Sequence, residues 1–261
     1  MLISTSELNK KLNDDNILII DARSWKEFES GHIPNAVNLD LFAFHWADTS
    51  NEGVEAFNRQ MVRILSSVGV SYDKFVVFYD DVSGMLAARG VWLLDYFAHE
   101  KVATLDGGIT KWVKEGYRIE KRPHVYKPAE FKPKIDTSVL ATYRYILDNL
   151  SNSNIRIIDA RTKNEYAGKS VRAARAGHIP KAMNVDWTDN IAKDGTFKSA
   201  DELKKLYGEI RNNAEVICYC QGGYRAANDY LALKKLGYKK LRVYLGSWYE
   251  WGNMLDLPIE R

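Results

Sequence analysis

The residues most able to do chemistry lie in one short segment, residues 220–225, with the sequence Cys-Gln-Gly-Gly-Tyr-Arg. A strand-like apolar run ends just before Cys220, and a helical pattern begins just after Gly223. Glycines at this point allow the backbone to curve tightly. In such a loop the backbone N–H groups, the positive end of the helix dipole and the Arg225 guanidinium all favour a thiolate. The spacing therefore predicts a nucleophilic cysteine at the end of a strand.

The composition of the whole chain is that of a soluble globular protein. Its 261 residues suffice for one large or two ordinary domains, and 46% of them are hydrophobic. A formal net charge of +3 gives no argument for a nucleic-acid partner, and no apolar run approaches the ~20 residues needed to span a membrane. Residues 1–7 lack the basic and apolar regions of a signal peptide, so we expect a cytoplasmic protein with neither nucleic acid nor membrane as partner.

The chain has two cysteines, Cys218 and Cys220. We expect no disulfide between them, because a regular strand and a reducing compartment both disfavour one. A metal site would need further ligands, and no histidine lies close to them in the sequence. We therefore expect neither a metal nor a cofactor, and we interpret Cys218 as a small buried residue.

Two blocks of sequence occur twice in the same order and at nearly the same offset. Asp-Ala-Arg begins at Asp21 and again at Asp159, and Gly-His-Ile-Pro begins at Gly31 and again at Gly177. A single repetition indicates a duplicated domain rather than a solenoid, which needs at least three repeats. Between the copies, a Lys-, Arg- and Pro-rich stretch predicts an extended linker. We place the domains at 1–120 and 136–261, with the linker at 121–135.

Each half alternates strand-like and helix-like patterns. Ser4 with Glu7 predicts a capping box at a first helix. Continuous apolar strands separated by helices favour a parallel sheet that is covered on both faces, and active sites in such sheets lie at the carboxyl ends of the strands. The predicted strands are 17–20, 75–79, 102–105, 155–158, 216–219 and 241–244, and the predicted helices are 55–67, 84–97, 137–150 and 200–210.

Taken together, these motifs resemble the tandem-domain rhodaneses, sulfurtransferases that move sulfane sulfur through a cysteine persulfide. The resemblance rests on the two Asp-Ala-Arg and two Gly-His-Ile-Pro segments, the duplication, the 220–225 loop and residues 246–251, Gly-Ser-Trp-Tyr-Glu-Trp. It implies an α/β fold of two tandem rhodanese-like domains, each with a mainly parallel sheet covered by helices on both faces. It also implies that the second domain is catalytic. In the first domain Asp80 stands where Cys220 stands in the second, and since an acid cannot carry a persulfide, that domain should be catalytically silent.

The activity that the resemblance implies is that of a thiosulfate sulfurtransferase without a cofactor. Cys220 would take sulfur from thiosulfate as a persulfide and pass it to cyanide or another thiophilic acceptor. The persulfide loop would comprise Cys220 with Gln221, Gly222, Gly223, Tyr224 and Arg225. Gln221 leans towards thiosulfate, but a 3-mercaptopyruvate sulfurtransferase stays open, as does a protein persulfide carrier. A phosphatase-like hydrolase is less favoured, because four residues rather than five separate Cys220 from Arg225.

Other site residues are carried over from the resemblance. Asp159 would help to hold the loop, and Arg225 would either bind an anionic donor or pair with an acid such as Asp159. The second half has ten residues between Tyr166 and Gly177, and this insertion contains three cations and no acid. It would supply substrate-binding Arg172 and Arg175, unless it is merely a solvated basic loop.

The remaining conspicuous residues are interpreted as structural. His32 and His178 recur in a domain without a nucleophile, so we expect them to be structural hydrogen-bonding groups rather than bases. Trp248 and Trp251 are expected to pack in the core. The partners would be a small sulfur donor and a thiophilic acceptor. An internal duplication often replaces a dimer interface, so we expect a monomer.

Overall fold

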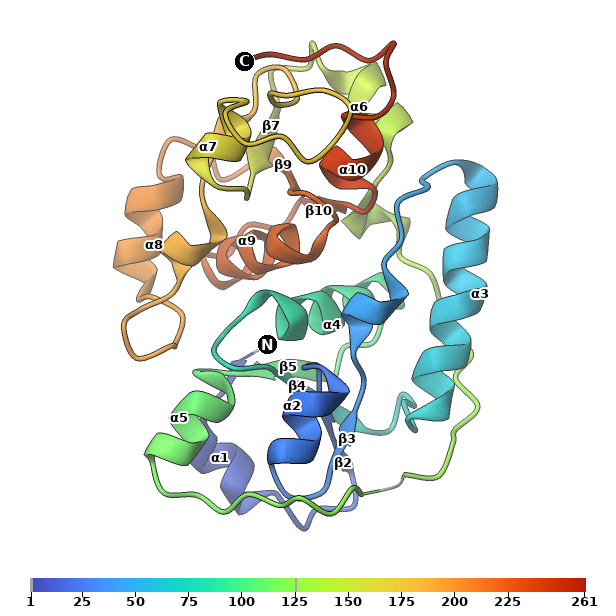
Figure 1. Ribbon diagram of the computed structural model, residues 1–261, viewed down its shortest axis with the longest axis vertical. Helices are drawn as coiled ribbons and strands as arrows, with labels where there is room; N and C mark the ends of the chain where they lie inside the picture. Colours follow the sequence, from blue (N-terminus) through green and yellow to red (C-terminus); the bar gives the residue numbers. More distant parts are fainter. Residues whose placement is uncertain (1, 125) are drawn as a thin grey trace. The chain divides into compact units, whose positions relative to one another are not determined.

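The structure is a computed structural model that describes residues 2–124 and 126–261. Its contacts divide the chain into two compact units (Figure 1). Unit 1 comprises Met1–Phe44, Ala56–Ile135 and Ile191–Phe197, and unit 2 comprises His45–Glu55, Asp136–Asn190 and Lys198–Arg261. Each unit thus includes a short segment from the other half of the sequence. The domain boundaries at 120 and 136 stay a prediction, because contacts do not test independent folding.

Unit 1 contains a five-stranded parallel sheet in the order β1-β5-β4-β2-β3. Its strands are β1 (Leu2–Ile3), β2 (Ile17–Asp21), β3 (Ala36–Asn38), β4 (Phe75–Tyr79) and β5 (Val102–Leu105). The helices are α1 (Thr5–Lys10), α2 (Trp25–Ser30), α4 (Met85–Tyr96) and α5 (Gly108–Lys114), with a 3-10 turn η1 (Leu41–Phe44). A further helix, α3 (Asn51–Ser67), begins in unit 2 and continues in unit 1.

Both faces of this sheet are covered, because alternate residues of each central strand point to opposite sides. On one face Val77 belongs to a cluster with Phe28 of α2 and Trp112 of α5. On the other, the ring of Phe78 lies against Gly90 of α4, where an added Cβ would be 2.4 Å from the ring. This close approach requires glycine in the middle of α4.

Unit 2 repeats the arrangement with the strand order β6-β10-β9-β7-β8, again all parallel. Its strands are β6 (Leu140–Ala141), β7 (Ile155–Asp159), β8 (Met183–Asn184), β9 (Glu215–Tyr219) and β10 (Leu241–Tyr244). The helices are α6 (Tyr143–Asn149), α7 (Lys163–Tyr166), α8 (Ala200–Tyr207), α9 (Tyr224–Lys235) and α10 (Ser247–Trp251), with 3-10 turns η2 (Thr137–Val139) and η3 (Trp187–Asn190). The predicted packing of Trp248 and Trp251 is confirmed, since both are buried in the core.

The predicted architecture is confirmed, and one predicted helix is wrong in part. All six predicted strands are present, as is the capping box between Ser4 and Glu7. The helix predicted over 137–150 begins only at Tyr143, where the Thr142 side chain caps it. The residues before it form η2 and an edge strand that pairs with β10, because that sheet edge is open to a parallel partner.

The repeated Asp-Ala-Arg and Gly-His-Ile-Pro motifs build the same buried network in both units. In unit 2 the Arg161 Nη2 donates to Asp159 Oδ2 at 2.6 Å and to the Gly177 carbonyl oxygen at 2.8 Å, while the Tyr219 hydroxyl donates to Asp159 at 2.6 Å. Unit 1 repeats these contacts with Asp21, Arg23, Gly31 and Tyr79. The motifs therefore fix the fold.

The two histidines of these motifs are also structural hydrogen-bonding groups, as predicted. His32 places its Nδ1 2.9 Å from the Phe28 carbonyl oxygen, and His178 places its Nδ1 2.9 Å from the Tyr166 carbonyl oxygen. Each ring also stacks on the aromatic side chain of that same residue. Neither imidazole is positioned as a catalytic base.

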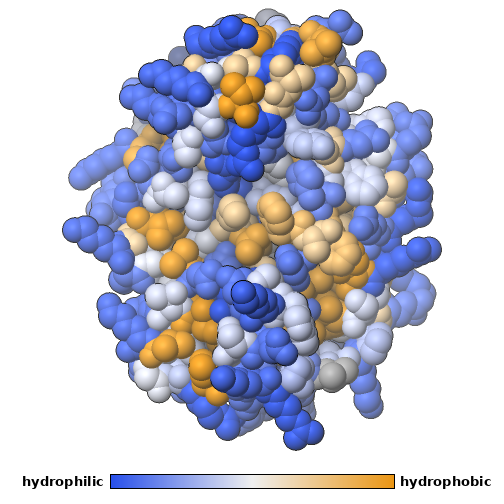
Figure 2. All heavy atoms as spheres, viewed as in Figure 1, coloured by the Kyte–Doolittle hydropathy of each residue, from blue (hydrophilic) through white to orange (hydrophobic). Residues whose placement is uncertain are grey.

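Hydrophilic side chains cover most of the face that Figure 2 presents, with hydrophobic residues in small groups between them. Among the described residues, no helix combines the length and the apolar character that a bilayer crossing requires.

Candidate active site

Cys220 is the first residue after β9, at the carboxyl end of a central strand. It is followed by a short loop and then by α9, whose N-cap is Gly223. Gly223 has a φ of 84°, a left-handed conformation that favours glycine. The Cys220 side chain is almost completely buried, with 1% exposure. The sequence prediction of a strand, a glycine-bearing loop and a helix start around this thiol is thus confirmed.

The backbone around the thiol is held on both sides. The Gly223 N–H donates to the Cys220 Sγ at 3.1 Å, which places one backbone donor on the sulfur. From the start of α10, the N–H groups of Trp248 and Tyr249 donate to the carbonyl oxygens of Cys220 and Gln221, each at 2.9 Å. The Ser247 hydroxyl accepts the Cys220 N–H at 3.2 Å. The start of α10 therefore holds the backbone of Cys220 and Gln221 in place.

Of the two roles left open for Arg225, the structure shows pairing with an acid, and that acid is Glu165 rather than Asp159. Its Nη1 and Nη2 donate to the two carboxylate oxygens of Glu165 at 2.7 and 3.0 Å. Asp159 is already occupied by Arg161 and Tyr219. Any support that Asp159 gives the loop is therefore indirect, through Tyr219, the residue before Cys220.

The charges of this pair are strongly coupled. Burial by itself would raise the pKa of Glu165, but hydrogen bonds and charge from Arg225 outweigh it and lower this pKa to about 2. Burial by itself would lower the pKa of Arg225, but hydrogen bonds to Glu165 and the charge of Cys220 raise it above its ordinary value. Both groups are therefore ionised at neutral pH.

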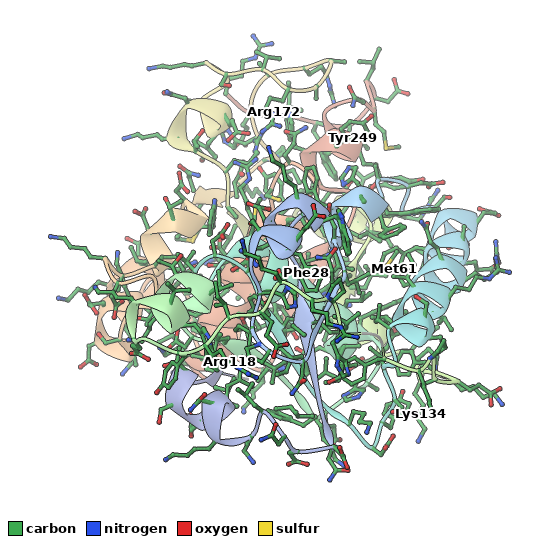
Figure 3. All side chains as sticks on the ribbon, turned by 60° about the horizontal axis from the view of Figure 1, so that its bottom comes forward. Phe28, Met61, Arg118, Lys134, Arg172 and Tyr249 are labelled. Carbon is green, nitrogen blue, oxygen red and sulfur yellow. The ribbon has the colours of Figure 1, made fainter. Side chains whose placement is uncertain are left out.

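The two arginines of the insertion have different surroundings. Arg172, labelled in Figure 3, is 60% exposed and its Nη1 lies 3.7 Å from Glu165. Its carbonyl oxygen accepts the Gln221 side-chain N–H at 2.9 Å, so it borders the loop. Arg175 instead donates to the carbonyl oxygens of residues 251, 252, 254, 255 and 257. Substrate binding by Arg175 is the wrong interpretation, because its guanidinium is committed to the backbone.

A histidine that sequence reasoning did not single out lies against the loop. A Cβ added to Gly222 would be 2.3 Å from the His45 Cε1, so only glycine leaves room for this ring. The ring centroid of His45 lies 6.0 Å from that of Tyr224 and 5.5 Å from that of Tyr249. Tyr249, labelled in Figure 3, is half exposed. These rings form an aromatic border beside the loop.

The segment that contains His45 is anchored within unit 2. The Thr49 N–H and hydroxyl donate to the Glu250 carboxylate at 2.7 and 2.6 Å. The Tyr244 hydroxyl donates to the same carboxylate at 2.7 Å, and the Tyr143 N–H donates to the Thr49 hydroxyl at 3.0 Å. Glu250 thus ties residues 45–55 to α10, the helix that also holds the loop 220–225.

The corresponding loop of unit 1 contains a carboxylate in place of the thiol. Asp80 is buried and accepts the N–H groups of Gly84, Leu86 and Ala87 at 2.9–3.1 Å. Burial raises its pKa to about 6, although these three donors act in the opposite direction. Asp80 therefore fills the helix N-terminus itself, as an acid that satisfies the helix dipole should.

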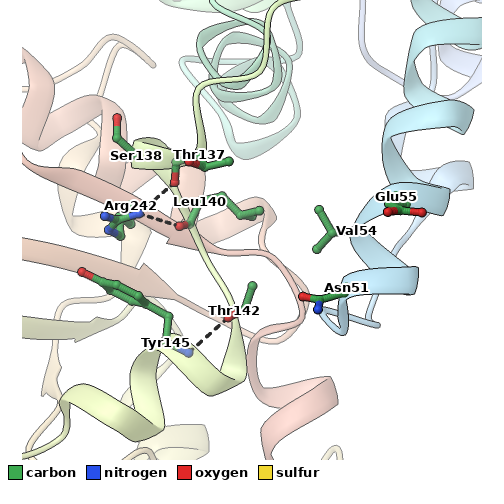
Figure 4. A pocket seen from close by; sticks show the side chains of 9 residues that line it. All are labelled: Asn51, Val54, Glu55, Thr137, Ser138, Leu140, Thr142, Tyr145 and Arg242. Carbon is green, nitrogen blue, oxygen red and sulfur yellow. Dashed lines mark hydrogen bonds between the residues drawn. The ribbon is translucent and has the colours of Figure 1, made fainter.

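An open pocket of about 650 Å³ in unit 2 does not include the cysteine loop. Figure 4 shows its lining, drawn from the start of α3, from the chain leading into α6 and from β10. Arg242 in this pocket is held by the carbonyl oxygens of Thr137 and Leu140. Among the described residues, no group of three or more His, Cys, Asp or Glu is placed to hold a metal ion.

Glu165 and His45 are the residues that sequence reasoning missed as neighbours of the loop. Glu165 carries a readable signal, since Thr162 and Glu165 have capping-box spacing, but that signal predicts a helix start and not a partner for Arg225. His45 carries none, because it comes from a sequence segment far from Gly222. Only the fold brings them together.

Comparison with known proteins gives a consistent result for both halves. A family model described as "Rhodanese-like domain" matches residues 4–115 and 142–254. A thiosulfate sulfurtransferase of Corynebacterium glutamicum is 31% identical, over 99% of this chain and 90% of its own length. The sulfur carrier protein TtuD of Thermus thermophilus is 30% identical, over 100% of this chain and 96% of its own length.

Among solved structures, an anaerobic ergothioneine biosynthesis enzyme from Chlorobium limicola is similar with a TM-score of 0.88. The match covers 99% of this chain and 69% of that enzyme's chain at 21% sequence identity, so this similarity shows the fold alone. The two matched halves and the two relatives, which are 30% and 31% identical over nearly the whole chain, show more than the fold. The chain belongs to the rhodanese-like family, as a sulfurtransferase with two tandem rhodanese-like domains.

Proposed function

We propose that the protein is a thiosulfate sulfurtransferase that passes sulfane sulfur to a thiophilic acceptor, such as cyanide, through a persulfide on Cys220. The observation that carries this proposal is the buried Cys220 thiol at the start of α9, with the Gly223 N–H on its sulfur. A relative that matches 99% of this chain and 90% of its own length is named a thiosulfate sulfurtransferase.

The first half-reaction forms the persulfide. The Cys220 thiolate attacks the outer sulfur of thiosulfate, the sulfur–sulfur bond of the donor breaks, and sulfite leaves with the electron pair. Cys220 then carries the transferred sulfur as a terminal anion. No proton, oxidant or cofactor enters this step.

The second half-reaction regenerates the thiolate. The carbon of cyanide attacks the terminal sulfur, the Cys220 disulfur bond breaks, and thiocyanate leaves. The sulfur is thus exchanged between two nucleophiles, and atoms and charge balance over the cycle. Double displacement of this kind predicts ping-pong kinetics.

The chain's contribution is to hold the sulfur in a dry, polar loop. The N–H groups at the start of α9 favour negative charge on the sulfur in both half-reactions. Burial of Cys220 keeps water from the persulfide. Arg172, exposed and next to Gln221, is the cation that an anionic donor would meet on approach.

Thiocyanate production from cyanide, measured side by side with thiosulfate and 3-mercaptopyruvate as donors, tests the proposal. We expect fast turnover with thiosulfate and none in Cys220→Ser, with Cys218→Ala as a control that keeps the nucleophile. Retained turnover in Cys220→Ser would refute the mechanism. A preference for 3-mercaptopyruvate would mean that this compound, and not thiosulfate, is the sulfur donor.

A persulfide carrier is the second candidate, because one full-length relative is named a sulfur carrier protein. A carrier should accept sulfur on Cys220 but release it slowly to small acceptors. Mass spectrometry after incubation with thiosulfate would then show Cys220 with one additional sulfur, while thiocyanate formation stays slow. Rapid release to cyanide would exclude this reading.

A further inference from the structure

We infer that Glu165 is a positioning residue that determines the specificity for the sulfur donor. Its carboxylate cancels the charge of Arg225 in the loop 220–225, and this limits the preference of the site for multiply charged anionic donors. This inference rests on the proposed function. It assigns no contact between Glu165 and substrate, since Glu165 acts through Arg225.

The geometry holds this pair firmly. Both oxygens of Glu165 accept from Arg225, at 2.7 and 3.0 Å, and the two side chains are only 6% and 13% exposed. The Oε2 atom also accepts the Thr162 N–H at 3.1 Å and its hydroxyl at 3.0 Å. Glu165 is therefore fixed from two sides, and Arg225 is held by a bidentate contact that gives both energy and direction.

The charges near the loop show what this pairing does. Glu165 stays ionised because Arg225 keeps its pKa near 2, so the two charges cancel. Among the described residues at this pair, Arg172, 3.7 Å from Glu165, is then the cation that is not bound by two carboxylate oxygens. Apart from the Cys220 thiolate itself, an anion reaching the loop thus meets about one net positive charge from these three side chains, although Arg172 and Arg225 are both present.

Other titratable groups around the pair leave this balance unchanged. Asp159 also faces Arg225, but its charge is matched by Arg161. Burial and the nearby Asp229 raise the pKa of Cys218 well above its ordinary value, so that thiol is neutral. His45 lies over Gly222 on the other side of the loop.

Unit 1 provides a matched internal control. Glu27 forms the same capping box with Ser24 that Glu165 forms with Thr162. The loop of unit 1, residues 80–85, contains no arginine or lysine. Glu27 therefore has the capping role of Glu165 without the loop arginine, and replacing it tests the cap alone.

The experiment measures the local charge at Cys220 without relying on sulfur transfer. Iodoacetate and iodoacetamide alkylate the same thiolate, but only the first carries a negative charge. The rate constant for iodoacetate divided by that for iodoacetamide is therefore independent of the thiolate fraction at Cys220 and reports the local charge. Loss of labelling in Cys220→Ser identifies the site. In Glu165→Gln we expect the ratio to rise about three- to tenfold, the scale of one unit charge acting over roughly 10 Å near a protein surface.

Two further variants separate charge from structure. Glu27→Gln, which alters only a cap, should leave the ratio within about 1.5-fold of wild type. Arg225→Gln should lower the ratio by about the same factor, because Glu165 is then uncompensated. This opposite sign keeps the test decisive even if Glu165→Gln folds poorly.

Steady-state kinetics complete the test. With thiosulfate, a dianion, and benzenethiosulfonate, a monoanion, we expect Glu165→Gln to lower KM more for thiosulfate, by about threefold or more, than for the monoanion. An unchanged alkylation ratio in Glu165→Gln, or an equal change in Glu27→Gln, would overturn the role of Glu165. A wild-type protein that turns over neither donor would refute the proposed function instead.

Discussion

Replacement of Arg175 separates a structural arginine from a binding one. Its Nη1 donates to the carbonyl oxygens of Leu255 and Leu257 at 3.1 and 2.6 Å, and its Nη2 donates to those of Trp251 and Met254 at 2.9 and 2.5 Å. Arg175→Met keeps most of the aliphatic stem and removes these four bonds, together with the longer one from Nε to the Gly252 carbonyl oxygen at 3.4 Å. At a net value of about 0.5–1.5 kcal/mol for each bond, with water replacing part of the loss, we expect a destabilisation of about 2–4 kcal/mol.

The assay is urea unfolding followed by circular dichroism, paired with the KM for thiosulfate. Arg175→Met should lower the free energy of unfolding while its KM at 25 °C stays within about twofold of wild type. Arg172→Met is the matched variant from the same insertion. Because Arg172 is 60% exposed and forms one long ion pair, it should change stability by less than about 0.5 kcal/mol and raise KM several-fold. An Arg175→Met protein with wild-type stability and a raised KM would refute this assignment.

Three further predictions address the two loops and the ion pair. The Asp80 carboxyl has a pKa of about 6 in the folded state and about 3.9 in the unfolded state, so the folded state holds a proton that the unfolded state loses between these values. The free energy of unfolding should therefore fall by roughly 2–3 kcal/mol as the pH rises from about 4 to 6. The urea midpoint of the wild type should show this loss, and that of Asp80→Asn should not. For Glu165 the dependence of stability on pH has the opposite sign, because its pKa of about 2 in the folded state lies below the unfolded value of about 4.3. Its contribution of about 3 kcal/mol to the free energy of unfolding is present above pH 4.3 and is lost towards pH 2. An acid titration of Glu165→Gln should lack that loss. Gly223→Ala should lower the free energy of unfolding by about 1 kcal/mol, because residue 223 has a φ of 84°. It should also reduce the rate of persulfide formation about tenfold, because the backbone N–H moves away from the sulfur. Unchanged stopped-flow kinetics would show that this donor is dispensable.

The sequence carried enough information to predict the sheets and the strand–loop–helix setting of Cys220. The runs that became β4, β5 and β10 were predicted with the bounds that the structure shows. The clearest of them is β4, which is apolar throughout, as a central strand buried on both faces should be. Cys220 could be placed because a strand, two glycines and a helix follow one another within a few residues. Such signals are local, and a local pattern is what a single sequence displays.

What could not be predicted depends on contacts between distant parts of the chain. The edge strand β6 is two residues long, and it exists only because β10 offers it a partner. Arg172 and Arg175 lie in the same basic run, and nothing local distinguishes them. Arg175 is structural because the backbone of residues 251–257 lies beside it, a fact of tertiary packing.

The comparison of the two units shows which contacts a catalytic unit, as proposed for unit 2, shares with a unit that has no cysteine at the same position. Asp21, Arg23 and Tyr79 form in unit 1 the buried network that their counterparts form in unit 2, with distances that agree within about 0.1 Å. This network therefore cannot distinguish an active unit from a silent one. It holds the ends of the central strands in place, which any residue at the strand end requires.

The difference lies in the loop and in the side chain that the helix N-terminus receives. In unit 1 the backbone N–H groups at the start of α4 are occupied by Asp80, a fixed carboxylate of the chain itself. In unit 2 the N–H of Gly223 meets the Cys220 sulfur, which under the proposed function gains one sulfur atom and loses it again. Because the same donors favour any negative charge, the fold supplies the stabilisation in both units. The residue after the strand decides whether that stabilisation serves the fold or a transferable group.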